Sequence, residues 1–220
     1  MAADLQARYE ALHREMVEEF ERALVRENQG LLYTLLGWQH LVTCVVSYYL
    51  LEVREIDASH QWVYAALWIA QALVAVGLYK SFSRRPQPGD SPLKGLNRRV
   101  WTAFLLLAFN VAGLNAVAGL PVFVYMPVLA TLSSFAFAAA SVLIARRLLL
   151  AAGLMFITGI LMARFPDYAF LLYGGSWLVI LQTLGVIFLR KRRRWRADHP
   201  PQPDNCADAL PQVVTAPEHA

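Results

Sequence analysis

The segment from Lys80 to Arg99 constrains the fold more than any other part of the sequence. It contains six Lys or Arg residues and one acid, Asp90, and apolar runs long enough to cross a bilayer lie on both sides of it. Short loops rich in Lys and Arg resist translocation and stay on the cytoplasmic side of a membrane. This basic segment therefore sets the predicted orientation of the apolar runs that flank it.

Six apolar runs alternate with short charged or proline-containing segments, in a chain of 220 residues of which only 16% are charged. A soluble domain typically carries about 25% charged residues. The runs hold roughly 16 to 22 residues each, close to the length that crosses about 30 Å of hydrocarbon. We predict an all-α integral membrane protein, a six-helix transmembrane bundle over residues 31–189, with spans at about 31–51, 62–79, 100–120, 127–145, 148–163 and 168–189.

The distribution of basic residues supports this number of spans. With six spans and both termini inside, all 20 Lys and Arg except Arg54 and Arg164 fall on the cytoplasmic side. Joining the fourth and fifth runs into one helix would place Arg146 and Arg147 in hydrocarbon, at a cost of about 2.5 to 3.5 kcal/mol each. We therefore expect a tight cytoplasmic hairpin there, in a multi-pass protein of the inner (plasma) membrane.

The two ends of the chain are predicted to be separate cytoplasmic segments. Residues 1–30 have the pattern of an amphipathic helix that ends at Gly30, with apolar side chains at three- and four-residue steps over residues 5–24. Its polar face holds more acids than arginines, which favours a protein partner or self-association over adsorption to an anionic membrane. Residues 190–220 combine a polybasic stretch with a proline-rich tail that we expect to be disordered.

Basic side chains next to the spans are expected to contact the bilayer and its anionic lipid head groups. They flank apolar runs and do not form a patch on a soluble fold, so nucleic acid is not an expected partner. The residues predicted to make these contacts are Arg84, Arg85, Arg98, Arg99, Arg190, Lys191, Arg192, Arg193 and Arg194.

The sequence indicates no metal, no cofactor and no particular reaction. Cys44 lies in an apolar run and Cys206 in the polar tail, so neither a disulfide nor a cysteine-based metal site is expected. The chain has no Gly-x-Ser-x-Gly, His-Glu-x-x-His or Walker motif and no paired acids inside the spans. A haem held by two histidines would need a second histidine at the depth of His40. An enzyme is therefore the less favoured class.

Polar side chains gather inside the predicted spans, and His40 is the one Asp, Glu, His, Lys or Arg well inside any of them. They form the predicted polar seam, which comprises Gln39, His40, Thr43, Gln71, Asn110, Asn115 and Gln182. Two interpretations are open: the groups are interhelical hydrogen-bond partners, worth about 0.6 kcal/mol per contact, or they line a path for a solute or proton. Both require mid-depth groups to converge, because an unpaired polar group in hydrocarbon costs several kcal/mol.

Three functions remain open at this point. The favoured hypothesis is a small transporter-like or channel-like protein that uses the polar seam around His40. The alternative is a membrane scaffold or regulatory subunit that acts through the N-terminal helix and the basic segment, and the third is a membrane-embedded lipid enzyme. Replacement of His40, deletion of residues 1–29 and measurement of membrane lipids would separate the three.

Overall fold

The computed structural model of the protein describes nearly all of the apolar part of the chain, and this part is helical. The described residues are 5–6, 8, 11–12, 14–19, 28–53, 61–82, 92–118, 122–143 and 146–198, and no strand occurs among them. The elements are α2 (Gln29–Tyr48), the π-helix η1 (Tyr49–Val53), α3 (Gln61–Phe82), α4 (Pro92–Val117), α5 (Val122–Leu143), α6 (Leu148–Arg164), the 3-10 helix η3 (Pro166–Tyr168) and α7 (Ala169–Asp198).

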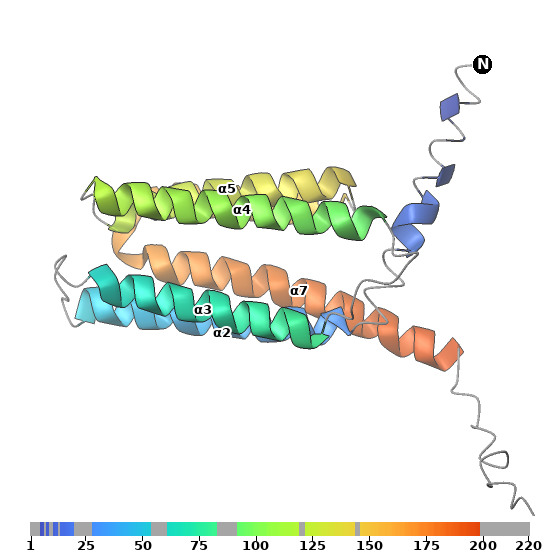
Figure 1. Ribbon diagram of the computed structural model, residues 1–220, viewed down its shortest axis with the longest axis horizontal. Coiled ribbons are helices and arrows are strands. Elements are labelled where there is room, and N and C mark those ends of the chain that lie inside the picture. The colour runs from blue at the N-terminus through green and yellow to red at the C-terminus, as the bar shows by residue number, and fades with distance from the viewer. Residues whose placement is uncertain are drawn as a thin grey trace, which may run out of the picture.

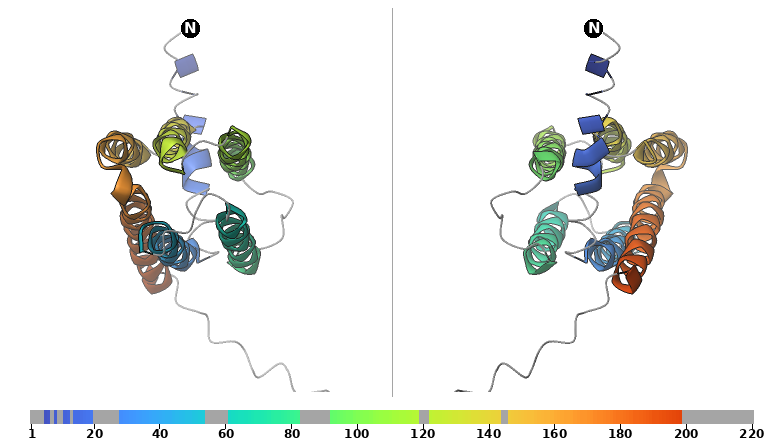
Figure 2. Two further views of the ribbon diagram at one scale, coloured as in Figure 1. Left: turned by 90° about the vertical axis from the view of Figure 1, so that its left-hand side faces the viewer. Right: turned by 90° about the vertical axis from the view of Figure 1, so that its right-hand side faces the viewer.

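The long helices run roughly antiparallel and form two layers. The helices α4, α5 and α6 make one layer, and α7, α2 and α3 make the other (Figures 1 and 2). The layers are joined mainly through α7, which contacts α6 and α5 in addition to its extensive contact with α2. In contrast, α3 contacts chiefly α2 and lies at the edge of its layer.

The helices have the length and surface of membrane spans. In the described part of the chain, five are long and apolar enough to cross a membrane, at Gln29–Leu51, Val63–Phe82, Gly95–Val117, Val124–Val142 and Pro166–Trp195. The remaining apolar helix, α6, is shorter, with 17 residues. Large apolar side chains such as Leu73, Leu106 and Leu150 are exposed on the outside of the bundle. The fold is therefore that of an all-helical, membrane-embedded protein.

Several helices extend beyond the predicted spans. The helix α4 begins at Pro92, inside the basic segment and before the predicted span at about 100–120. A proline is tolerated at the first helical position because no hydrogen-bonding N–H is needed there. The polybasic stretch is a helical continuation of α7 as far as Asp198. The tail predicted to be disordered begins at residue 197, but residues 197 and 198 are the last of α7. Residues 83–91 of the basic segment and residues 199–220 of the tail lie outside the described residues.

The prediction that Gly30 ends the N-terminal helix was wrong, because this glycine lies inside α2. That helix begins at Gln29 and is preceded by Asn28, whose backbone is left-handed with φ 57° and ψ 34°. Asparagine tolerates this conformation better than other residues with a Cβ. The break between the N-terminal segment and the first span is thus made by Asn28, and Gly30 is free to serve in packing.

Glycines allow α2 and α7 to approach closely. A Cβ atom added at Gly30 would lie 2.8 Å from the backbone nitrogen of Leu189 and 2.9 Å from the backbone oxygen of Gly185. At the other end of the interface, a Cβ added at Gly174 would lie 2.6 Å from the Cβ of Cys44. Small residues at such positions let membrane helices make backbone-to-backbone van der Waals contact. The first and last predicted spans are therefore packed against each other without room for a methyl group at these sites.

Hydroxyl groups connect α7 to the opposite layer. The Tyr173 hydroxyl lies 3.0 Å from Oγ of Ser133 on α5, and Ser133 Oγ donates to the backbone oxygen of Leu129 at 2.8 Å. On α6, Thr158 Oγ1 lies 2.7 Å from Ser176 Oγ of α7. Because each of these hydroxyls is also tied to a partner, the layers are joined by satisfied polar contacts as well as by apolar packing.

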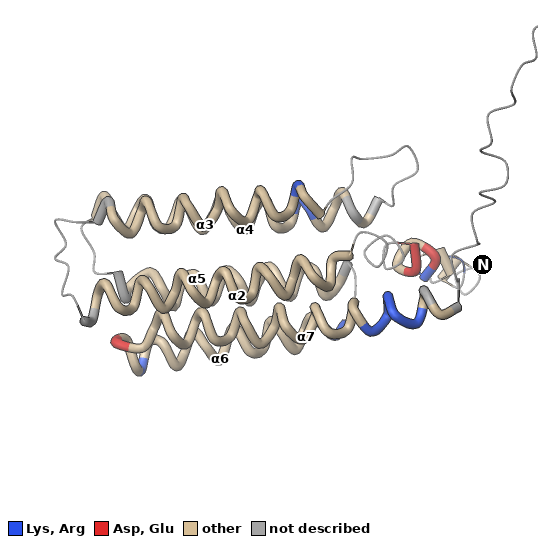
Figure 3. The backbone as a smooth tube through the Cα atoms, turned by 90° about the horizontal axis from the view of Figure 1, so that it is seen from below, with Lys and Arg blue, Asp and Glu red and all other residues tan. Residues whose placement is uncertain are grey.

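Part of the N-terminal helix packs on the end of the bundle where α4 begins. Leu93, in the first turn of α4, is only 7% exposed and is covered by Met16 and Val17 together with Phe188 of α7. These contacts lie next to the polybasic end of α7 (Figure 3). The apolar stripe of the N-terminal segment is thus used at least in part to contact its own membrane domain.

Cysteines placed at Val17 and Leu93 in a Cys206→Ser variant are expected to be joined by a short thiol crosslinker within one chain, because these side chains pack in one apolar cluster. The product should migrate as a monomer on a denaturing gel. A Leu12→Cys, Leu93→Cys pair serves as the control, because Leu12 is 56% exposed. Crosslinks found only between two chains would contradict this intramolecular docking and support self-association.

Candidate functional site

His40 lies where α2, α3 and α7 meet, and it is half-buried there. Nδ1 of the His40 ring lies 2.6 Å from Nε2 of Gln71 on α3. Gln39 Nε2 donates to the backbone oxygen of Gln71 at 2.7 Å, and Thr43 Oγ1 donates to the backbone oxygen of Gln39 at 3.1 Å. Four residues of the predicted polar seam therefore do come together, and they link α2 to α3.

Both ring nitrogens of His40 have a contact. While Nδ1 faces Gln71, Nε2 lies 3.7 Å from the Sγ atom of Cys44, one turn further along α2. When the Gln71 amide nitrogen donates to Nδ1, the ring proton is on Nε2 and points at the sulfur. Rotating the amide by 180° places the ring proton on Nδ1 instead. In either arrangement a singly protonated ring uses both nitrogens.

Three aromatic rings surround the imidazole and form what we call the aromatic cage, Trp68, Tyr173 and Trp177. Their centroids lie 5.8, 5.4 and 5.6 Å from that of His40, with interplanar angles of 72°, 67° and 62°. Such edge-to-face geometry is favourable for aromatic pairs. The cage is built from α3 and α7, so the position of His40 depends on tertiary packing as well as on its own helix.

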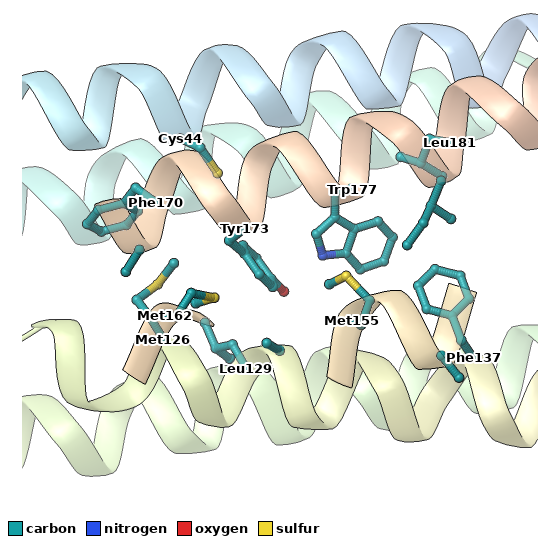
Figure 4. Close-up of a cluster of buried hydrophobic side chains, with 14 residues drawn as sticks. Cys44, Met126, Leu129, Phe137, Met155, Met162, Phe170, Tyr173, Trp177 and Leu181 are labelled. Atoms are coloured by element: carbon teal, nitrogen blue, oxygen red, sulfur yellow. The ribbon is translucent and has the colours of Figure 1, made fainter. Parts of the chain in front are cut away.

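The aromatic cage continues into the core between the two layers. Trp177 lies 5.2 Å from Phe137 of α5 and 6.0 Å from Trp101 of α4, measured between ring centroids. Figure 4 shows Tyr173 and Trp177 projecting from α7 toward this core. The same core contains three methionines that are fully buried, Met126, Met155 and Met162. His40 thus lies at the edge of a packed core, where it contacts Gln71 and the aromatic cage.

The remaining residues of the predicted polar seam lie elsewhere. Gln182 Nε2 donates to the backbone oxygen of Thr34 at 3.1 Å and so links α7 to α2, away from the aromatic cage. Asn115 is buried on α4, at 8% exposure. The expected convergence of Asn110 with His40 was wrong, because Asn110 is exposed on α4 and no hydrogen bond joins it to Gln39, His40 or Gln71.

The rotation of α4 explains the exposure of Asn110. Trp101 and Phe104 of this helix pack against the core. At about 100° per residue, Asn110 is turned roughly 180° from Trp101, whereas Asn115 is turned only about 40° from it. Depth along a span can be counted from the sequence, but the direction in which a side chain points depends on where the helix packs.

Several of the residues predicted to contact anionic lipid belong to the described part of the chain, and these lie toward one end of the bundle. Arg98 and Arg99 are exposed near the start of α4, and the polybasic stretch forms the last turns of α7 (Figure 3). Arg164 is the last residue of α6, next to the turn that leads into α7, so it lies at the opposite end of α7 from the polybasic stretch. Arg84 and Arg85 lie outside the described residues.

Comparison with known proteins adds no assignment to this geometry. No family model matches the chain, and no curated protein or solved structure matches it either. In the described part of the chain, no group of three or more His, Cys, Asp or Glu side chains is placed to hold a metal ion. The protein is thus defined as an all-helical membrane-embedded protein by its own helices, and its activity has to be argued from the His40 site.

Proposed function

We propose that the protein is a transporter-like or channel-like protein of the inner membrane, with the site around His40 as its solute or proton path. The observation that carries this proposal is the position of His40. It is half-buried at a junction of three helices, and its nitrogens face Gln71 and Cys44 instead of a charged partner. Titratable groups inside membrane spans are costly and mark ion, proton or substrate pathways.

The proposal includes six spans with both termini in the cytoplasm. At roughly 1.5 Å per residue, the 17 residues of α6 extend about 25 Å, which is at the short end of what crosses a bilayer. Six antiparallel spans also explain why Arg146 and Arg147, exposed between α5 and α6, belong to the same end as the polybasic stretch of α7. The positive-inside rule then places that end in the cytoplasm.

Topology is tested by single cysteines on each side of α6 in a Cys206→Ser variant. An impermeant thiol reagent added to intact cells is expected to label Phe165→Cys and to leave Arg147→Cys unlabelled until the cells are lysed. Both positions are exposed, and Cys44, at 0% exposure, should remain unlabelled in the parent variant. Equal labelling of both positions in intact cells would mean that α6 does not cross the membrane.

Transport through the His40 site is tested by flux measurements on purified protein in liposomes. Proton flux is followed with an entrapped pH-sensitive dye, and solute flux by osmotic swelling. The His40→Leu variant is expected to lose flux while remaining folded, because it retains apolar contact with the aromatic cage but loses both nitrogens. Val42→Ala on the same helix is the control, because Val42 is 58% exposed on the outer surface. Full activity of His40→Leu would exclude the path.

The docked N-terminal segment favours a second candidate, a membrane scaffold or regulatory subunit. Met16 and Val17 cover Leu93, but Leu5 and Leu12 of the same segment are 61% and 56% exposed. This exposed remainder is available to a protein partner or a second copy. On this alternative, deletion of residues 1–19 abolishes function in cells while His40→Leu does not.

Anionic lipid is the proposed partner of the polybasic end of α7. Five basic residues in succession, Arg190 to Arg194, follow the apolar part of that helix, and each such residue near an anionic surface contributes about 1 kcal/mol. The protein should therefore bind vesicles with anionic lipids more tightly than neutral ones, and replacing these five residues by glutamine should remove the difference.

A further inference from the structure

Within the described ranges, three buried polar atoms on side chains that contact His40 lack a hydrogen-bond partner. They are the indole nitrogens of Trp68 and Trp177 and Oε1 of the Gln71 amide. The Trp68 and Trp177 ring centroids lie 5.8 and 5.6 Å from that of His40, and the Gln71 amide nitrogen lies 2.6 Å from its Nδ1. Trp68 and Gln71 share one helix, α3. Ser47 Oγ, two turns beyond His40 on α2, is also buried without a partner.

Rotation of the Gln71 amide does not remove this deficit. If the amide is turned so that Oε1 accepts from His40 Nδ1–H, the amide nitrogen takes the place of the oxygen as the unpaired atom. A donor on Trp68 and one end of the Gln71 amide therefore remain open in either case. Buried polar groups in native proteins are almost always paired with protein or with ordered water. Inside a membrane an unpaired polar group costs more free energy, because no bulk water is present to bond it.

The surroundings select against a charged occupant. Among the described residues, the side chains that make ring or polar contacts with His40 are Trp68, Gln71, Tyr173 and Trp177, with Cys44 on its own helix, and none of these is Asp, Glu, Lys or Arg. An ion in such a place would lose its hydration without a compensating charge, at a high cost. A neutral molecule that both accepts and donates hydrogen bonds would satisfy the indole and the amide without that cost.

We propose that the species admitted at the His40 site is a small uncharged molecule with both donor and acceptor groups, of the class of water, urea and glycerol, and not an ion. This inference rests on the proposed transport function and names its substrate class. The occupant accepts from Trp68 Nε1–H and, with the Gln71 amide nitrogen on His40 Nδ1, donates to Gln71 Oε1. If the amide is rotated, the occupant accepts from the amide nitrogen instead, and in both cases His40 holds the amide in place.

The Trp68→Phe variant separates an occupied site from an empty one. Phenylalanine keeps an aromatic ring in the cage but removes the N–H, so an occupied site loses one hydrogen bond to its solute. An empty site instead loses an unsatisfied buried donor, which is expected to raise the melting temperature. Trp38→Phe is the matched control, because Trp38 is 54% exposed on the outer surface of α2.

The experiment measures the permeability of proteoliposomes by stopped-flow light scattering for water, urea and glycerol, and by ion-sensitive dyes for potassium, chloride and ammonium. We expect permeability to at least one of the neutral solutes above that of empty liposomes and none to the ions. Loss of one hydrogen bond should reduce this permeability roughly three- to tenfold in Trp68→Phe, with Trp38→Phe unchanged.

Three results would overturn the inference, and they are distinguishable. Permeability to an ion alone would leave the transport function standing but refute the substrate class. Neutral permeability that is unchanged in Trp68→Phe, together with a raised melting temperature, would show that this site is dry and that solute passes elsewhere. No permeability to any of the six species, in a protein shown to be folded, would refute the proposed transport and this inference with it.

Discussion

Replacing Gly30 by alanine is expected to destabilise the protein by about 1 to 3 kcal/mol, the usual cost of forcing extra atoms into a packed interior. The added Cβ would lie 2.8 Å from the nitrogen of Leu189 and 2.9 Å from the oxygen of Gly185, which are backbone atoms and cannot rotate away. Relief requires α2 and α7 to move apart along their contact. Unfolding of the purified protein in mixed micelles by a denaturing detergent measures the change.

Two adjacent glycines of α7 provide the control. A Cβ at Gly174 would lie 2.6 Å from Cys44 Cβ, whereas a Cβ at Gly175 meets no atom within 4 Å. We therefore expect Gly174→Ala to be destabilising and Gly175→Ala to be neutral or stabilising, because alanine favours a helix by up to about 1 kcal/mol over glycine. Equal effects at the two positions would contradict the observed rotation of α7 against α2.

The second large effect is expected at the contact between His40 and Gln71. His40→Phe keeps an aromatic ring inside the cage but leaves the Gln71 amide without its partner, at a cost of about 1 to 3 kcal/mol. Gln71→Leu has the converse effect, because it leaves His40 Nδ1 unpaired in the bundle. The double variant removes both ends of the bond, so its destabilisation should be smaller than the sum of the two by about 1 kcal/mol.

A third amide tests whether this coupling is specific. Gln182 links α7 to α2 through Thr34, which lies six residues, or about 9 Å, from His40 along α2. The combination of His40→Phe with Gln182→Leu should therefore be additive within about 0.5 kcal/mol. The same detergent unfolding assay measures all of these variants. Additivity of His40→Phe with Gln71→Leu as well would mean that the 2.6 Å contact contributes nothing to stability.

Charge and apolar run length could predict the class of fold from the sequence, because both follow from the cost of placing polar groups in hydrocarbon. They could not predict the helix ends. The helix α4 begins at Pro92 and α5 begins at Val122 with Pro127 inside it, whereas the predicted spans begin at about residues 100 and 127. Three of the polar residues that were expected to converge inside the spans, Gln39, His40 and Gln71, do lie together.

The sequence could not predict which helices pack against each other, because that depends on which faces of the helices come into contact. Asn110 lies on a face of α4 that is turned away from His40. The aromatic cage joins Trp68 of α3 to Trp177 of α7, two residues that are more than 100 positions apart in sequence. One pattern in the sequence does indicate the close contact of α2 with α7, namely small residues at a seven-residue spacing. Gly30, Gly37 and Cys44 recur every seven residues and line one face of α2, and each lies against α7.

The role of α7 as the connection between the layers has a consequence for biogenesis. A ribosome delivers α2 well before α7, yet these two helices share the most extensive contact in the bundle, and α7 also joins α2 to α5 and α6. Until α7 leaves the translocon, α2 and α3 have no path to the other layer through this helix, and the face of α2 that carries Gly30 is open to lipid or to a chaperone. Completion of the bundle, and with it the cage around His40, therefore waits for the insertion of α7.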